Sequence, residues 1–174
     1  TLLQDPVYLK RLDCLTTTLP EETKTVSIYS LGERDALVWG NNKYLILAPT
    51  ILLKKGTTSE NLSTELLNHR LTLYYLSAEG DEDANTLKLY LRYEISGIGG
   101  SSTEETDDKE SWASDYNVRY TNVSYVNLQP IISMYKSTHS GSEPEKVTVE
   151  YEYNNSASSI PTIAKKRTKT VTYS

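Results

Sequence analysis

The two histidines are the residues of this chain best suited to acid–base chemistry, because imidazole gains and loses a proton near neutral pH. His69 ends a predicted helix, where positive charge is favourable, and His139 lies in a Ser-Thr-Gly loop. A Ser-His-Asp triad can form from residues distant in sequence, but no G-x-S-x-G motif is present. We therefore expect no catalytic residue and a non-enzymatic protein. An enzyme that depends on His69 or His139 is the less favoured alternative.

Metal and cofactor sites lack a matching motif as well. Cys14 is the only cysteine, so neither an internal disulfide nor a cysteine-based zinc cluster can form. Its apolar neighbours favour a small buried side chain over a nucleophile. Asp81 and Asp83 imitate the start of a calcium-binding loop, but Thr86 and Arg92 stand where that loop needs a glycine and an acid. We expect no metal and no cofactor.

A basic cluster near the end of the chain is the candidate for nucleic-acid binding; its members are Lys165, Lys166, Arg167 and Lys169. On an extended strand, alternation puts three of the four on one face, where they could neutralise phosphates or contact another subunit. The favoured alternative is an edge strand whose charges prevent unwanted pairing. The formal net charge of −5 argues against nucleic acid as the main partner.

Aromatic residues are the candidates for ligand contact, since the chain has two Trp, fourteen Tyr and no Phe. Tyrosine combines an apolar ring with a polar tip, which suits half-buried strands and interfaces, although compositional bias explains the count equally well. Trp112 lies beside an acidic loop predicted between residues 97 and 115 and is expected to be exposed. Trp39 either contacts a ligand or covers the core at a turn next to Gly40.

Period-two alternation predicts the strands that must position these residues. Three strands carry the strongest pattern; their alternating apolar sets are Leu87, Leu89, Leu91, Tyr93 and Ile95; Val147, Val149, Tyr151 and Tyr153; and Leu71, Leu73 and Tyr75. Each strand places one such set on one face and the intervening polar residues on the other.

Five weaker strands are predicted at residues 24–31, 43–53, 116–126, 131–136 and 162–173. Pro49 predicts an edge position, a bulge or a break in the second of them. The alternation of the third shifts phase near Asn122, and Pro130 precedes the fourth.

A short helix is predicted over residues 59–68, because Leu62, Leu66 and Leu67 recur at helical spacing. Hydroxyl residues just before it, including Ser59, could cap its first turn. We expect this helix to cover one edge or end of the sheet.

The fold class predicted from these elements is all-β, an eight-stranded antiparallel jelly-roll-like sandwich with one short helix. A length of 174 residues fits a single domain spanning 1–174, with 1–23 as an N-terminal extension and 24–173 as the sandwich core. No apolar run approaches the roughly 20 residues of a membrane span, so no membrane insertion is expected.

The order of these elements resembles the single jelly roll of small viral coat proteins. In that family a short helix commonly follows the second strand and the chain ends at the eighth, a match that covers about residues 24–173. The likeness is architectural, with no residue motif, and this sequence lacks the Arg-rich N-terminal arm that many coat proteins use against nucleic acid. The resemblance implies a virion protein, a coat subunit that self-assembles into a symmetric homo-oligomer and forms the capsid.

A second resemblance is to the fibre heads of adenoviruses. Thr1-Leu2 followed by Cys14, and Glu143-Pro144 before the strand at residues 146–149, are similar to that family, although Leu3 stands where the family has Trp. This likeness implies a receptor-binding spike or fibre-head domain for host attachment. A third hypothesis is a microbial carbohydrate-binding or adhesin β-sandwich, at the cell surface or secreted. The coat subunit is the main prediction, and a host receptor or glycan is the expected outside partner.

Overall fold

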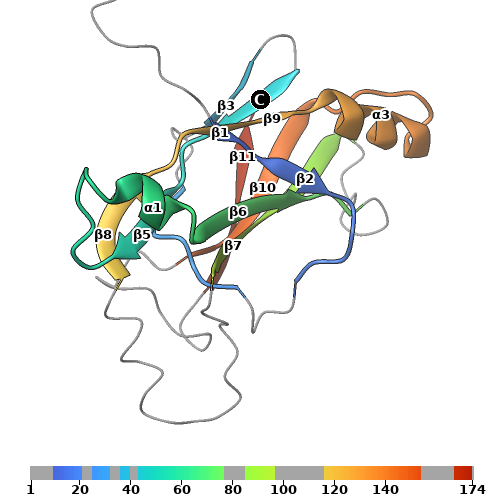
Figure 1. Ribbon diagram of the computed structural model, residues 1–174. Coiled ribbons are helices and arrows are strands. Elements are labelled where there is room, and N and C mark those ends of the chain that lie inside the picture. Colours follow the sequence, from blue (N-terminus) through green and yellow to red (C-terminus); the bar gives the residue numbers. More distant parts are fainter. Residues whose placement is uncertain are drawn as a thin grey trace, which may run out of the picture.

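The protein is represented by a computed structural model, which describes residues 10–20, 25–31, 36–39, 43–76, 85–96, 116–153 and 167–173 (Figure 1). In these ranges the chain is mostly β-strand, with two helices, and its strands form a five-stranded sheet, a four-stranded sheet and a two-stranded ladder. The strands are β1 Lys10–Arg11, β2 Asp13–Leu15, β3 Ala36–Trp39, β4 Tyr44–Leu47, β5 Thr50–Lys54, β6 His69–Tyr74, β7 Thr86–Ile95, β8 Tyr116–Thr121, β9 Ser124–Asn127, β10 Lys146–Tyr153 and β11 Arg167–Tyr173.

The five-stranded sheet has the order β11-β10-β7-β6-β2 and contains all three strongly predicted strands. Their alternating apolar side chains face the core: Leu73, Leu87, Leu89 and Val149 are fully buried. β7 is antiparallel to β6, and β10 is antiparallel to β11. In contrast, β10 is parallel to β7 and β2 is parallel to β6. The strands read from alternation are confirmed, and their pairing is mixed.

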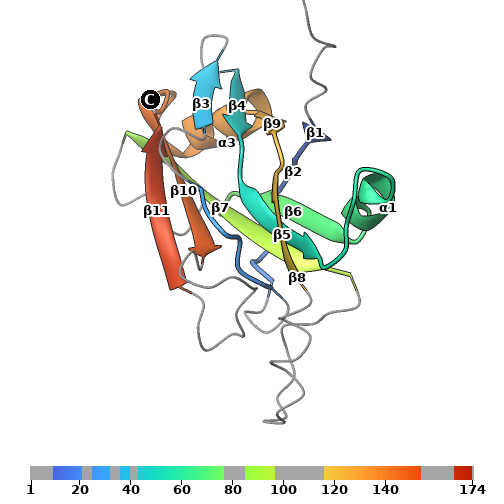
Figure 2. The same cartoon turned by 90° about the vertical axis from the view of Figure 1, so that its left-hand side faces the viewer.

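The second layer is a pair of long antiparallel strands that both bend at their middle. β4 continues into β5, and β9 pairs with β4 while β8 pairs with β5 (Figure 2). The breaks lie opposite each other, because the N–H of Asn122 donates to the carbonyl of Pro49 at 2.9 Å. The predicted interruption at Pro49 and the predicted phase shift near Asn122 are therefore one structural feature, a bend that wraps this layer over the core.

Two short segments cross between the layers. In the first, β1 pairs with β9 of the four-stranded sheet and β2, two residues later, pairs with β6 of the other sheet. In the second, Val26 bridges to Tyr93 and Ile28 to Tyr153, both beyond the point where β7 and β10 stop pairing with each other. Ser30 then bridges to Thr50 of β5. The predicted strand at 24–31 is thus present only as isolated bridges. Part of the predicted extension 1–23 contributes strands to both sheets.

Helix α1 (Leu62–Leu66) is shorter than the predicted helix 59–68. The expected hydroxyl cap is wrong, because its N-cap is Asn61, which makes no capping side-chain hydrogen bond. The preceding hydroxyl residues serve the turn instead: Thr57 Oγ1 donates to the Lys54 carbonyl at 2.5 Å. The expected placement is confirmed, since α1 packs against β5 and β6 at one end of the layers (Figure 1).

Helix α3 (Gln129–Thr138) occupies the residues where a strand was predicted at 131–136, and that prediction is wrong. Pro130 lies in the first helical turn, where a missing N–H is tolerated. Ile131 and Tyr135, four residues apart, are the helix residues that bury against the core, at 4% and 0% exposed. A proline is compatible with the start of a helix or of a strand, so Pro130 does not distinguish the two. The burial of one helical face against the core favours the helix.

The predicted eight-stranded antiparallel jelly roll is accordingly corrected to a mixed, mostly β fold with two helices in the described residues. The three parallel pairs, β1/β9, β2/β6 and β7/β10, are incompatible with an all-antiparallel roll. A parallel pair needs a crossover connection, and β8, β9 and α3 supply it between β7 and β10.

Candidate functional site

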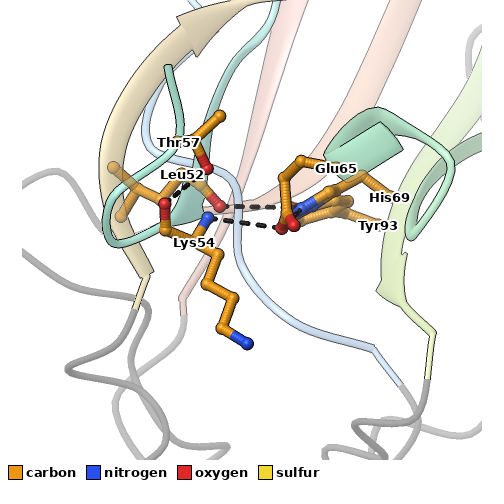
Figure 3. Close-up of polar contacts among 6 residues, drawn as sticks. All are labelled: Leu52, Lys54, Thr57, Glu65, His69 and Tyr93. Atoms are coloured by element: carbon orange, nitrogen blue, oxygen red, sulfur yellow. Dashed lines mark hydrogen bonds and ion pairs between the residues drawn. The ribbon is translucent and has the colours of Figure 1, made fainter. Parts of the chain in front are cut away.

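A connected group of titratable side chains lies where α1 meets the two layers (Figure 3). His69 Nε2 and Glu65 Oε1 are 2.7 Å apart, and His69 Nδ1 is hydrogen-bonded to the hydroxyl of Tyr93. Glu65 comes from α1, His69 begins β6 and Tyr93 lies on β7. The same carboxylate oxygen accepts the N–H of Lys54 at 3.4 Å, and the Tyr93 hydroxyl lies 3.4 Å from the Leu52 carbonyl. We call Glu65, His69 and Tyr93 the relay.

The relay is enclosed by aromatic rings and by the core. The His69 ring stacks on Tyr93 with centroids 5.8 Å apart and meets Tyr116 edge-on at 5.9 Å. Only 2% of the His69 side chain and 12% of the Glu65 side chain are exposed. Burial raises the pKa of Tyr93 well above its ordinary value, with smaller contributions from Tyr116 and Glu65. The Tyr93 hydroxyl therefore keeps its proton and is not a base.

A carboxylate that orients a histidine toward a hydroxyl is the arrangement of a hydrolase triad, yet here the hydroxyl is a core atom. Tyr93 is 1% exposed, so a substrate does not reach its oxygen without displacing the core. The geometry is that of an internal support, which ties α1 to strands of both layers.

His139 lies far along the chain from the relay, just after α3 rather than in an open loop. Its ring stacks on Tyr135 with centroids 3.8 Å apart and planes 6° apart. Its Nδ1 lies 2.8 Å from the Tyr135 carbonyl and 2.9 Å from Thr138 Oγ1. The two histidines thus have different partners and do not form a common site. His69 lies where β6 begins, and His139 lies at the C-terminal end of α3.

A second charged network lies on the face of the five-stranded sheet that points away from the core. Arg92 donates from Nη2 to Glu150 Oε2 at 3.0 Å, and its Nε lies 3.9 Å from Glu152 Oε1. Thr25 Oγ1 donates to that same Glu152 oxygen at 2.6 Å. Arg92 is 9% and Glu152 5% exposed, so both charges depend on each other for compensation. Alternation placed Arg92 on the polar face of one predicted strand and Glu150 and Glu152 on that of another, but it predicted neither their pairing nor their burial.

The basic cluster is only partly described by the structure. Lys165 and Lys166 lie outside the described residues, and Arg167 begins β11. Lys169 is exposed and pairs across from Tyr151 on β10. Because β11 is the end strand of its sheet, a lysine there protects the edge from further strand pairing. This placement fits the favoured alternative of a charged edge.

Of the two tryptophans proposed as ligand contacts, Trp112 lies outside the described residues. Trp39 is the last residue of β3, directly before Gly40, and its backbone pairs with Tyr44 of β4. On the outward face of this four-stranded sheet, Tyr44 and Tyr125 meet edge-on with centroids 6.3 Å apart. Both rings are half-buried, and exposed Arg11 is the strand partner of Tyr125. We call Tyr44, Tyr125 and Arg11 the tyrosine face.

Sequence reasoning did not identify the tyrosine face, although a signal for it existed. In β4, Tyr44 and Ile46 alternate with the buried Leu45 and Leu47, so the outward side of this strand carries an aromatic ring. The run at residues 43–53 is apolar almost throughout, which is also typical of a strand covered on both faces and obscured this alternation. The partner ring, Tyr125, comes from a strand about 80 residues later, and only the pairing of β4 with β9 brings the two together.

Cys14 is half-buried against the core on β2, across from Leu73. Burial raises the pKa of its thiol to about 12. At about pH 8 the thiolate fraction is then roughly a thousandfold below that of an ordinary cysteine. We expect a disulfide exchange reagent to label the native protein about a thousandfold more slowly than the protein in denaturant.

The same shift has a consequence for alkaline stability. Above about pH 9 the unfolded thiol ionises while the folded one stays protonated, so the free energy of unfolding should fall as the pH rises from about 9 to about 12. A Cys14→Ala variant should lack this part of the pH dependence. Equal labelling rates in native buffer and denaturant would contradict a buried thiol.

One cavity is lined entirely by residues that the structure describes. A shallow cavity of about 10 Å³, the size of one water molecule, lies between β3, α3 and β11, and Val38, Leu128 and Tyr173 are among its lining residues. Residues described by the structure include no group of three or more His, Cys, Asp or Glu placed to hold a metal ion. Neither described helix has the length and apolar character to cross a membrane.

Comparison with known proteins finds the same fold in a bacterial protein. Neither a protein-family model nor a curated protein matches this sequence. A Bacteroides fragilis protein described as a "putative lipoprotein" superposes with a TM-score of 0.75 at 20% identity, over 99% of this chain and 73% of its own. An uncharacterized protein from Parabacteroides merdae gives a TM-score of 0.49 at 15% identity, over 95% and 66% of the two chains.

The Bacteroides fragilis structure overturns the viral prediction. The fold is shared with a bacterial protein, so the resemblance to small viral coat proteins and adenovirus fibre heads is wrong. The predicted capsid function, viral host attachment and virion location depended on this resemblance and are wrong as well. Strand order along the chain had suggested a jelly roll, but the parallel pairs that distinguish the two folds are not visible in strand order.

Proposed function

We propose that the chain is a non-enzymatic binding module, exposed at a bacterial cell surface or secreted, that binds carbohydrate. The observation that carries this proposal is the tyrosine face, a pair of half-buried rings on the outward side of a sheet. Aromatic rings with one polar end suit ligands that are apolar on one side and hydroxylated on the other, as sugar rings are. Strand positions hold the rings rigidly, which limits the entropy lost on binding.

Polar side chains flank the rings. Exposed Arg11 lies beside Tyr125, and exposed Asn127 is the strand partner of Tyr44. A guanidinium donates hydrogen bonds, and an amide both donates and accepts them, so the pair matches ligand hydroxyl groups.

The comparisons support an extracytoplasmic setting for this module. The Bacteroides fragilis protein of the same fold is described as a "putative lipoprotein", and lipoproteins are held at a membrane by a lipid anchor. By analogy of fold, we place this chain at the cell surface or in the secreted fraction. A binding module of this kind needs no partner subunit, so light scattering should find a monomer. The predicted symmetric homo-oligomer is the competing outcome.

Replacing either tyrosine of the face should weaken binding without unfolding the protein. We expect Tyr44→Ala and Tyr125→Ala to raise the Kd for a bound oligosaccharide about tenfold or more, equivalent to about 1.4 kcal/mol. Calorimetry with neutral hexasaccharides of glucose, mannose and galactose, and with an acidic oligogalacturonate, measures this change.

Tyr153→Ala is the matched control, because Tyr153 is also half-buried but lies on β10 of the other sheet. It should leave the Kd unchanged. Binding that survives in both Tyr44→Ala and Tyr125→Ala would place the site elsewhere on the protein. Failure of every oligosaccharide to bind would reject carbohydrate as the ligand.

A further inference from the structure

The relay contains one hydroxyl proton and two acceptors for it. Tyr93 can donate either to His69 Nδ1 or to the Leu52 carbonyl, which lies 3.4 Å away on β5. Because the carboxylate of Glu65 only accepts, His69 Nε2 carries a proton in both charge states of the ring. The protonation of His69 is therefore decided at Nδ1 alone.

Each charge state of His69 has a complete set of hydrogen bonds. In the neutral ring, Nδ1 accepts the Tyr93 hydroxyl proton. When solvent supplies a proton to Nδ1, that N–H donates to the Tyr93 oxygen, and the Tyr93 hydroxyl turns to the Leu52 carbonyl. No covalent bond to Tyr93 changes, since its hydroxyl keeps its own proton and exchanges only the acceptor.

We propose that His69 is a proton-responsive latch, in which protonation at Nδ1 turns the Tyr93 hydroxyl onto Leu52 and fastens α1 to both layers of the fold. The charged ring gains a counterion, because Glu65 Oε1 lies 2.7 Å from Nε2, and hydrogen bonds to charged groups are the stronger ones. The titratable groups that face His69 from the described elements packed on it are Glu65 from α1, Tyr93 from β7 and Tyr116 from β8.

The latch acts on a short segment at the edge of the core. α1 has five residues, none of them fully buried; Leu62 and Leu66 pack partly against the core, and the helix ends beside Leu67, which is 84% exposed. Its hold on β5 includes the contact of Glu65 with the Lys54 N–H. A segment with few buried contacts opens locally far more readily than the core, so one strengthened network changes its opening equilibrium.

Hydrogen exchange tests this latch in the intact chain. Protection of the amides of residues 54–68, corrected for the intrinsic exchange rate at each pH, should be about fivefold higher near pH 5.5 than near pH 8. His69→Gln has no titrating ring and should show equal protection at both pH values. Tyr93→Phe keeps the Glu65–His69 pair without the hydroxyl and should lose the gain as well.

Equal protection in the wild-type protein at both pH values would overturn the proposal. So would the same gain in His69→Gln, because another group would then be responsible, and a gain kept in Tyr93→Phe would remove the hydroxyl from the mechanism. If a variant does not fold, ¹⁵N resonances of the wild-type ring decide. The neutral ring should carry its proton on Nε2. A neutral ring with its proton on Nδ1 instead would overturn the latch.

Discussion

Replacing Arg92 with methionine is expected to lower the free energy of unfolding by about 3–5 kcal/mol, because it removes the positive charge from beside a buried carboxylate. Arg92 is 9% exposed and reaches both Glu150 and Glu152. Glu152 is 5% exposed and would keep the hydrogen bond from Thr25 but lose the charge of Arg92. Methionine retains most of the apolar stem, so the loss reports the charge rather than a cavity. Chemical denaturation monitored by tryptophan fluorescence measures it.

Arg119→Met is the matched control for this prediction. Arg119 is exposed on β8 and stacks over the Tyr29 ring at 4.3 Å, a contact worth about 0.5–1 kcal/mol at such a site. Adding Glu152→Gln to Arg92→Met replaces the buried Glu152 carboxylate with a neutral amide and should recover part of the free energy of unfolding. If Arg92→Met costs no more than Arg119→Met, the network does not support the fold.

The second large effect is expected at Tyr135, where alanine should cost about 3–5 kcal/mol, as for other buried aromatic side chains. Tyr135 is fully buried, projects from α3 into the core and stacks on His139. Its removal leaves a cavity under the helix and frees the last helical turn. Both thermal and chemical denaturation should show the loss, with a decrease in helical circular dichroism.

Met134→Ala separates burial from helix propensity, because Met134 is the neighbouring helix residue and is 37% exposed. It should change stability by less than about 1 kcal/mol. Tyr135→Phe keeps the ring and should cost much less than Tyr135→Ala. A similar loss for Met134→Ala and Tyr135→Ala would show that α3 contributes through helix formation alone.

These predictions distinguish buried charged groups, which support the fold, from half-buried rings on the outward face of a sheet, which bind a ligand. The relay and the Arg92 network both hold charged groups beside buried or half-buried partners. Removing the Arg92 network should lower the free energy of unfolding, and changing the relay should alter the local opening of α1. The tyrosine face carries little of the core, so its removal should affect binding. Measuring stability and ligand affinity on the same variants therefore tests whether support and recognition are separate in this fold.

The sequence alone determined which segments are strands wherever one face is buried along the whole segment. In β7 and β10 alternation is unbroken, and both were predicted from it. Pro49 and the phase shift near Asn122 also marked the bend of the second layer, because a proline cannot donate to a ladder and an irregular residue reverses the faces. These are local properties, and local periodicity reports them.

Only the tertiary structure decided what is paired with what. β7 and β10 are parallel partners about 60 residues apart. Alternation is the same in parallel and antiparallel strands, so it could not reveal that the jelly-roll prediction was wrong. The same holds for the sites. Glu65 and His69 are four residues apart in the sequence, whereas Tyr93, Tyr125 and the partners of Arg92 come from distant strands. Chemistry that depends on side chains from different strands becomes readable only when the sheets are assembled, because the contacts that define it are long-range.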